Sequence, residues 1–171
     1  ASSLAALIDC CREYGALTIA DEVMTGFGRT GPLFASVNPD LICLSKGLTG
    51  GFLPLGITAC KEEIFNAFLS DRLEKAFLHG HSYTANPLGC VSALASLDLL
   101  LLDSCAKQRE MIADSHQSFC LEWGQHPRLK RCESLGTLLV WEYKTECSSY
   151  FEPIRDRLYD FFLGHGLLLR P

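Results

Sequence analysis

The sequence predicts an α/β fold that is followed by the start of a smaller α+β domain. Residues 3–14 have the apolar spacing of an amphipathic helix, and the apolar run at 16–20 that follows is typical of a parallel strand buried on both faces. A second apolar run at 41–44 predicts another buried strand. A long apolar helix is expected to begin at Pro87, and the pattern changes after Pro127.

The first half of the chain is expected to alternate helices and strands. The N-terminal helix is predicted from residues that recur at helical spacing, namely Leu4, Leu7, Ile8, Cys11 and Tyr14. Residues 53–60 predict a third strand, and residues 61–68 predict a short helix. The stretch at 25–39 contains several glycines and prolines, and the stretch at 70–84 is mostly polar, so both are expected to be connections.

The second half predicts two helices and then mixed elements. Residues 87–102 are expected to form the long apolar helix, because proline suits a first helical turn. Residues 105–123 predict a second helix. A strand at 137–143, an amphipathic helix at 149–163 and a strand at 167–169 are expected to follow.

These elements divide the chain into three expected parts. Residues 1–103 are expected to belong to a large domain, residues 104–127 to a connecting helix, and residues 128–171 to the start of a small domain. The first helix has no strand before it, and the last strand-like run has no turn after it. We therefore interpret the chain as a piece of a larger protein.

Charge and hydropathy argue against two classes of partner. The chain has 48% hydrophobic and 20% charged residues, which is typical of a folded protein with a core. Its formal net charge is −5 and it has no cluster of lysines and arginines, so nucleic acid is not expected as a partner. The apolar runs are short and interrupted, so no membrane span is expected.

The chain contains nine cysteines. They form no C-x-x-C pair, and no Cys/His spacing suggests a zinc site, so no metal is expected. Most of them lie within apolar patterns. We expect buried, reduced cysteines in a cytoplasmic protein.

One aspartate and one lysine stand at the ends of predicted strands. Asp21 follows the run at 16–20, and Lys46 follows the run at 41–44. The carboxyl ends of parallel strands open into one crevice, so both side chains are expected to face it. An amine that forms a Schiff base and a carboxylate that holds a pyridinium nitrogen are the two groups that pyridoxal phosphate chemistry needs most. Without further context, a lysine at the end of a strand, such as Lys46, is usually a solvated surface residue.

Three longer segments surround these residues. Residues 19–31 read Ile-Ala-Asp-Glu-Val-Met-Thr-Gly-Phe-Gly-Arg-Thr-Gly, and residues 39–48 read Pro-Asp-Leu-Ile-Cys-Leu-Ser-Lys-Gly-Leu. Residues 79–90 read His-Gly-His-Ser-Tyr-Thr-Ala-Asn-Pro-Leu-Gly-Cys. In order and spacing they resemble the signatures of class-III aminotransferases, the ω-aminotransferase group. The resemblance implies a type I pyridoxal-phosphate-dependent transferase fold, from the C-terminal part of its large domain to the start of its small α+β domain.

The same resemblance implies roles for individual residues. Lys46 is expected to be the catalytic residue that bonds pyridoxal 5'-phosphate and contacts substrate, and Asp21 to hold the cofactor's ring nitrogen. Val23 is expected to pack on one ring face, although an ordinary core valine is the alternative. Ser82 stands where the family usually has threonine and is expected to bind the cofactor phosphate of the neighbouring subunit of a homodimer. Gly80 and His81 are expected to contact substrate, with an exposed loop histidine as the alternative for His81.

Within the family, the segments at 48–51 and 53–58 look most similar to the branch that acts in biotin synthesis. That branch implies transamination of 8-amino-7-oxononanoate to 7,8-diaminononanoate, with S-adenosylmethionine or lysine as amino donor. The family's phosphate loop and its carboxylate-binding arginine lie outside this sequence, so we expect the chain to be inactive alone. Arg29 is expected to fix its loop or a dimer contact.

Two alternatives stay open. The first is another ω-aminotransferase or an aminomutase of the same family, which would use the same Lys46 and Asp21. The second is a non-catalytic, truncated protein that acts as a dimerisation or regulatory partner.

Overall fold

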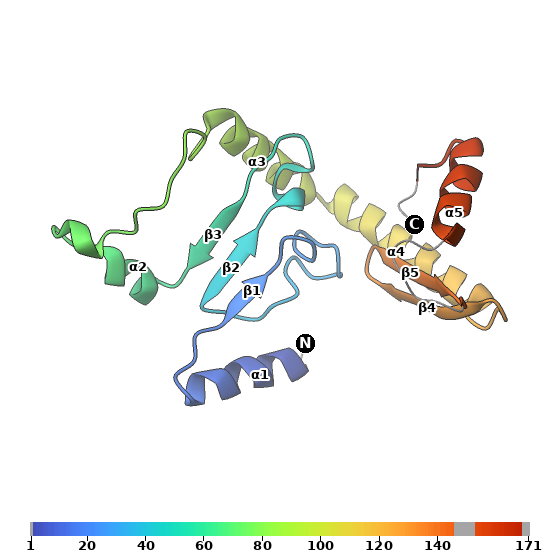
Figure 1. Cartoon of the computed structure of the whole chain (residues 1–171), viewed down its shortest axis with the longest axis horizontal. Coiled ribbons are helices and arrows are strands. Elements are labelled where there is room, and N and C mark those ends of the chain that lie inside the picture. The colour runs from blue at the N-terminus through green and yellow to red at the C-terminus, as the bar shows by residue number, and fades with distance from the viewer. Residues whose placement is uncertain (1, 146–152, 169–171) are drawn as a thin grey trace.

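The structure is a computed structural model that describes residues 2–145 and 153–168. A three-stranded sheet lies at one end and a two-stranded hairpin at the other, and helix α4 leads from one to the other (Figure 1). The α-helices are α1 (Ser2–Glu13), α2 (Glu62–Phe68), α3 (Pro87–Leu100), α4 (Asp103–Trp123) and α5 (Pro153–Gly164). The strands are β1 (Ile19–Asp21), β2 (Leu41–Leu44), β3 (Ile57–Cys60), β4 (Leu129–Leu135) and β5 (Leu138–Tyr143). Two short 3-10 helices are η1 (Lys46–Thr49) and η2 (Leu73–Lys75).

The sheet has the order β1-β2-β3. Strands β1 and β2 are parallel, with Asp21 opposite Cys43, whereas β3 runs antiparallel to β2. The parallel pair confirms the two strands that the apolar runs predict, although the first begins at Ile19 rather than at residue 16 and includes Asp21. Both strands therefore end at the same edge of the sheet, which is where the chemistry is expected.

Strand β3 is shorter than the predicted strand at 53–60. The side chains before it explain the difference. The hydroxyl of Ser45 donates to the carbonyl oxygen of Leu55 at 2.7 Å, and the hydroxyl of Thr49 donates to that of Leu53 at 2.6 Å. These bonds hold residues before β3 in a loop against η1, so regular pairing begins only at Ile57.

The prediction that the first strand is buried on both faces is wrong for this chain. Ile19 keeps 67% of its surface exposed, and the buried apolar side chains among the described residues are Ile8, Phe27 and Leu44. Helix α3 contacts η1 and α4, and α4 also contacts both strands of the hairpin. Because these helices pack elsewhere, the apolar side chains of β1 stay open.

A buried carboxylate ties together the ends of the strands that lie opposite the candidate site. Asp40 is 4% exposed and accepts hydrogen bonds from the backbone N–H and the hydroxyl of Thr18, both at 2.7 Å. The ammonium group of Lys61 lies 2.6 Å from its other oxygen. Hydrogen bonds from Lys61 and Thr18 hold the pKa of Asp40 well below its usual range.

Replacing Asp40 by asparagine is expected to lower the stability of the protein most at neutral pH. A carboxyl whose pKa is lowered by folding stabilises the folded state above its unfolded pKa of about 4, and this stabilisation is lost as the pH falls further. The difference in thermal unfolding temperature between Asp40→Asn and the unmodified protein should therefore shrink below about pH 4. The exposed Glu62→Gln in α2 is the control. An equal difference at pH 7 and pH 3 would contradict this account of Asp40.

Helices α3 and α4 follow the predicted pattern with small shifts. The side chain of Asn86 accepts a hydrogen bond from the backbone N–H of Leu88 at 3.0 Å, and this caps α3 just before Pro87. Helix α3 ends at Leu100, and α4 begins at Asp103, two residues before the predicted start. Among the described residues, no single helix is long and apolar enough to cross a membrane, and α3 with α4 meets that test only as a pair bent by 73°.

The C-terminal part differs more from the prediction. Strand β5 confirms the strand expected at 137–143, but its antiparallel partner β4 was not predicted. Helix α5 covers the described part of the helix expected at 149–163, whose residues 149–152 lie outside the described residues. Leu167 and Leu168 are not in a strand, contrary to the prediction for 167–169, and residue 169 also lies outside the described residues.

The eight cysteines in the described ranges are free thiols, but they are not the buried residues that the sequence predicts. Cys10, Cys60 and Cys90 are exposed. The other five, Cys11, Cys43, Cys105, Cys120 and Cys132, are partly exposed. The open faces of the helices and of the sheet explain the difference, since the apolar patterns that contain these cysteines are only partly covered.

Candidate active site

Asp21 is the last residue of β1. Its Oδ1 accepts a hydrogen bond from the backbone N–H of Val23 at 3.0 Å, while the backbone N–H of Glu22 continues the strand pairing to the carbonyl of Cys43 at 3.0 Å. The carboxylate is exposed, and its other oxygen has no hydrogen-bond partner among the described residues. Asp21 therefore presents a fixed negative charge at the edge of the sheet.

Lys46 follows β2 at the same edge and opens η1. Its backbone has a φ of 45°, in the left-handed region that lysine rarely adopts. Ser45, directly before it, is extended and is anchored through its hydroxyl, and the carbonyl of Lys46 accepts a hydrogen bond from the N–H of Gly51 at 3.2 Å. The side chain is exposed, and a residue held in an uncommon conformation is more frequent at functional sites than elsewhere.

A buried carboxylate that the sequence reasoning did not single out supports this edge. Glu22 is 2% exposed and accepts hydrogen bonds from the hydroxyl of Thr25 and the backbone N–H of Ser36, each at 2.5 Å. Burial alone would raise the pKa of Glu22, but these hydrogen bonds outweigh it, and the pKa lies below its usual value. Its position directly after Asp21, at the start of a glycine-containing loop, was the available signal.

Phe27 joins that loop to the turn that carries Lys46. The Phe27 backbone has a φ of 61°, and its ring packs edge-on against Phe34 with the ring centroids 5.7 Å apart. A Cβ atom on Gly47 would lie 3.0 Å from the Phe27 ring, so the ring would have to move slightly to admit a larger residue. The loop after Asp21 and the turn of Lys46 therefore support each other.

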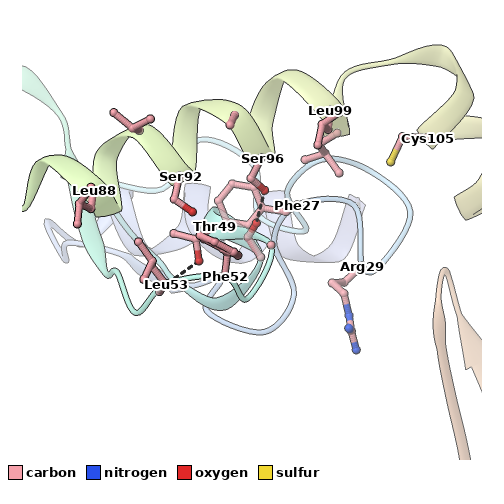
Figure 2. A pocket seen from close by; sticks show the side chains of 15 residues that line it. Phe27, Arg29, Thr49, Phe52, Leu53, Leu88, Ser92, Ser96, Leu99 and Cys105 are labelled. Carbon is pink, nitrogen blue, oxygen red and sulfur yellow. Dashed lines mark hydrogen bonds between the residues drawn. The ribbon is translucent and has the colours of Figure 1, made fainter.

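An open apolar cavity of about 900 Å³ lies beside this arrangement. It is formed between the turn after Lys46 and helix α3 (Figure 2). Its wall includes Phe27, Phe52 and Leu53 on one side and Leu88, Val91 and Leu99 of α3 on the other. None of the predicted site residues lines it, so this cavity is separate from the groups expected to do chemistry.

Ser82 lies in a different segment of the chain from Asp21 and Lys46. Gly80, His81 and Ser82 are exposed in the connection between α2 and α3, which runs beyond β3, the edge strand far from β1 (Figure 1). Hydrogen bonds within this connection hold residues 81–84 together. The hydroxyl of Thr84 accepts from the N–H of His81 at 2.9 Å, and the His81 ring accepts from the N–H of Tyr83 at 3.1 Å.

Residues 1–171 match the sequence model of the family described as aminotransferase class-III. The chain belongs to the class-III aminotransferase family. The adenosylmethionine-8-amino-7-oxononanoate aminotransferase of Synechococcus elongatus is 48% identical over 161 residues, which cover 92% of this chain and 38% of that protein. The protein of the same name from Aquifex aeolicus is 53% identical over 93 residues, which cover 52% of this chain and 20% of that protein.

Solved structures of family members have the same fold. The adenosylmethionine-8-amino-7-oxononanoate aminotransferase of Methanocaldococcus jannaschii superposes with a TM-score of 0.87 at 32% identity, over 96% of this chain and 41% of that one. An (S)-enantioselective omega-transaminase from Thermomicrobium roseum gives a TM-score of 0.84 at 30% identity, over 98% and 39%. The predicted α/β fold of the type I class is confirmed, and the chain spans less than half the length of these relatives.

Pyridoxal 5'-phosphate is the cofactor of this family, and two residues at the edge of the sheet fit it. Lys46 offers an exposed amine for the aldehyde, and Asp21 offers a free carboxylate oxygen for the ring nitrogen. Val23 is half-buried, and its N–H donates to Asp21. Among the described residues, no group of three or more histidines, cysteines, aspartates or glutamates is gathered as a metal site.

Proposed function

We propose that the protein containing this chain is a pyridoxal-phosphate-dependent aminotransferase of biotin biosynthesis. It would convert 8-amino-7-oxononanoate to 7,8-diaminononanoate, with S-adenosylmethionine or lysine as the amino donor. The observation that carries the reaction type is the pair Asp21 and Lys46 at the ends of adjacent parallel strands. The substrate is suggested by relatives that are 45–53% identical and named for it.

The chain's own residues have distinct tasks in this proposal. The bound cofactor supplies an acceptor for the electrons released at the substrate carbon. Asp21 would accept a hydrogen bond from the ring nitrogen and favour its protonated form, and the N–H of Val23 holds the carboxylate in place. Lys46 would hold the cofactor through Nζ and, when its amine is free, would hold or move a proton at the same atom. Val23 contacts a ring face.

We propose that Ser82, Gly80 and His81 serve the neighbouring subunit of a homodimer. Their connection lies beyond β3, away from the β1 edge of the sheet, and is exposed. The Ser82 hydroxyl would donate to the phosphate of the cofactor bound by the neighbouring subunit. Gly80 and His81 would contact the substrate in that subunit's site. A cross-subunit role is compatible with a loop that is exposed and has hydrogen bonds of its own.

The expected division into residues 1–103, 104–127 and 128–171 is kept as a proposal. It is supported by the bend between α3 and α4 and by the packing of α4 against β4. We also propose a cytoplasmic location, because free thiols persist in a reducing compartment. The chain covers 38% of its Synechococcus relative, and we expect the 171-residue chain alone to have no measurable turnover.

A donor and acceptor panel tests the proposal. The complete protein is assayed with 8-amino-7-oxononanoate and either S-adenosylmethionine or lysine, beside ornithine, acetylornithine, 4-aminobutyrate and β-alanine. Amination of 8-amino-7-oxononanoate in clear preference is expected. Preference for another amine would favour the alternative ω-aminotransferase. The similarity to an omega-transaminase is the observation that supports this alternative. A protein that takes up no pyridoxal phosphate would favour the non-catalytic alternative, and turnover by the isolated chain would refute its expected inactivity.

A further inference from the structure

The turn of the β4–β5 hairpin holds the loop that follows Asp21. The backbone N–H of Thr137 donates to the carbonyl oxygen of Arg29 at 2.9 Å, and the hydroxyl of Thr137 approaches the same oxygen at 3.3 Å. The two residues are 108 positions apart in the sequence. A contact between parts this distant connects the C-terminal hairpin to the N-terminal sheet.

Gly136 makes this contact unusually close. Its φ is +56°, and a Cβ atom there would lie 2.6 Å from the Arg29 carbonyl oxygen, from the Gly31 nitrogen and from the Thr30 carbonyl carbon. Real Cβ atoms do not approach backbone so closely, and backbone cannot move aside as a long side chain can. The hairpin turn therefore sits directly on the backbone of residues 29–31.

Arg109 of α4 adds a second contact to the same loop. A Cβ atom on Gly28, whose φ is +84°, would lie 2.8 Å from Nε of Arg109. Nη1 of Arg109 donates to the carbonyl of Leu100 at 3.1 Å and to Sγ of Cys105 at 3.2 Å, so the guanidinium is fixed. Both α4 and the hairpin are thus closely packed against residues 28–31.

The loop leads from these contacts to the candidate site. Its first residue, Glu22, follows Asp21, and the Glu22 carbonyl accepts a hydrogen bond from the N–H of Gly26 at 3.0 Å. Phe27 lies against Gly47, the residue after Lys46. The loop is therefore in contact with both strand ends that carry the proposed chemistry and with the C-terminal hairpin.

We propose that Gly136 and Thr137 are positioning residues, through which the β4–β5 hairpin fixes the loop that supports Asp21 and Lys46. The inference rests on the proposed function, because the residues that the hairpin would position are those that would hold the cofactor. If the hairpin moved, residues 22–31 would move with it. This would displace Asp21, which directly precedes the loop, and Lys46, which the loop supports through Phe27. Arg29, expected to fix its own loop, takes part through its backbone carbonyl.

The test measures cofactor binding by the complete protein. Gly136→Ala is expected to weaken the affinity for pyridoxal 5'-phosphate by about tenfold or more and to change the circular dichroism of the bound cofactor. Gly15→Ala is the matched control, because Gly15 has a similar φ of +69° but nothing within 4 Å of its would-be Cβ. Equal affinity and an equal spectrum for Gly136→Ala and the unmodified protein would overturn the inference.

A milder pair covers the case in which Gly136→Ala does not fold. Thr137→Val removes the hydroxyl donor and keeps the shape, and it is expected to lower cofactor affinity and turnover by about two- to tenfold with little change in KM. Thr137→Ser keeps the hydroxyl and should restore both. A Thr137→Val protein that loses thermal stability but binds cofactor normally would show a merely structural role. If the unmodified protein binds no cofactor, the proposed function fails rather than the positioning role.

Discussion

Replacing Lys46 by alanine is expected to remove the covalent attachment of pyridoxal 5'-phosphate to the complete protein. Borohydride treatment of the unmodified protein should fix the cofactor on the peptide that contains Lys46, and Lys46→Ala should give no such peptide by mass spectrometry. Turnover should fall by about 10²–10⁴-fold or more, because the variant loses both the bond to the cofactor and a group that moves the substrate proton.

The controls for this prediction test whether the amine of Lys46 is needed, rather than its positive charge or a lysine at another position. Lys46→Arg keeps a positive charge but offers no amine that can form the bond, so it should fail as Lys46→Ala does. Lys107→Ala removes an exposed lysine of α4 and should leave both attachment and turnover unchanged. Cofactor fixed on another lysine, or unchanged turnover by Lys46→Ala, would show that Lys46 is not the attachment residue.

Replacing Asp21 by asparagine is the second large effect that we expect. The asparagine oxygen can still accept the hydrogen bond from the N–H of Val23, so the turn after β1 should persist. The negative charge that keeps the ring nitrogen protonated is lost, and turnover should fall by about 10²–10³-fold. Attachment of the cofactor to Lys46 should remain detectable by mass spectrometry.

This separation of attachment from turnover distinguishes the two site residues. Asp98→Asn, a change at an exposed carboxylate of α3, is the control and should leave turnover unchanged. If Asp21→Asn kept turnover within about twofold, the role of Asp21 at the ring nitrogen would be contradicted. If it abolished cofactor attachment as well, Asp21 would matter for the shape of the site rather than for its charge.

Strands were predictable where the local pattern was clear. The strand at 41–44 matches β2 at both ends, because four apolar residues stand between Pro-Asp and Ser-Lys-Gly. Strand β4 was not predicted, because Lys130, Arg131 and Glu133 interrupt its apolar pattern. Its order comes from pairing with β5, which is a contact between strands rather than a property of the segment.

The same limit applies to the candidate site. Asp21 and Lys46 were predicted at one edge because each follows a parallel strand, and the pairing of β1 with β2 places them there. Their support was not predicted. The bond from Ser36 to Glu22 and the bond from Thr137 to Arg29 join residues 14 and 108 positions apart, and no local spacing encodes them.

The uncommon backbone of Lys46 has an evolutionary consequence. A left-handed residue other than glycine costs about 1–2 kcal/mol, so glycine at this position would make the fold more stable while ending the proposed chemistry. In a descendant sequence that had lost the proposed chemistry, nothing in this turn would favour lysine over glycine at position 46.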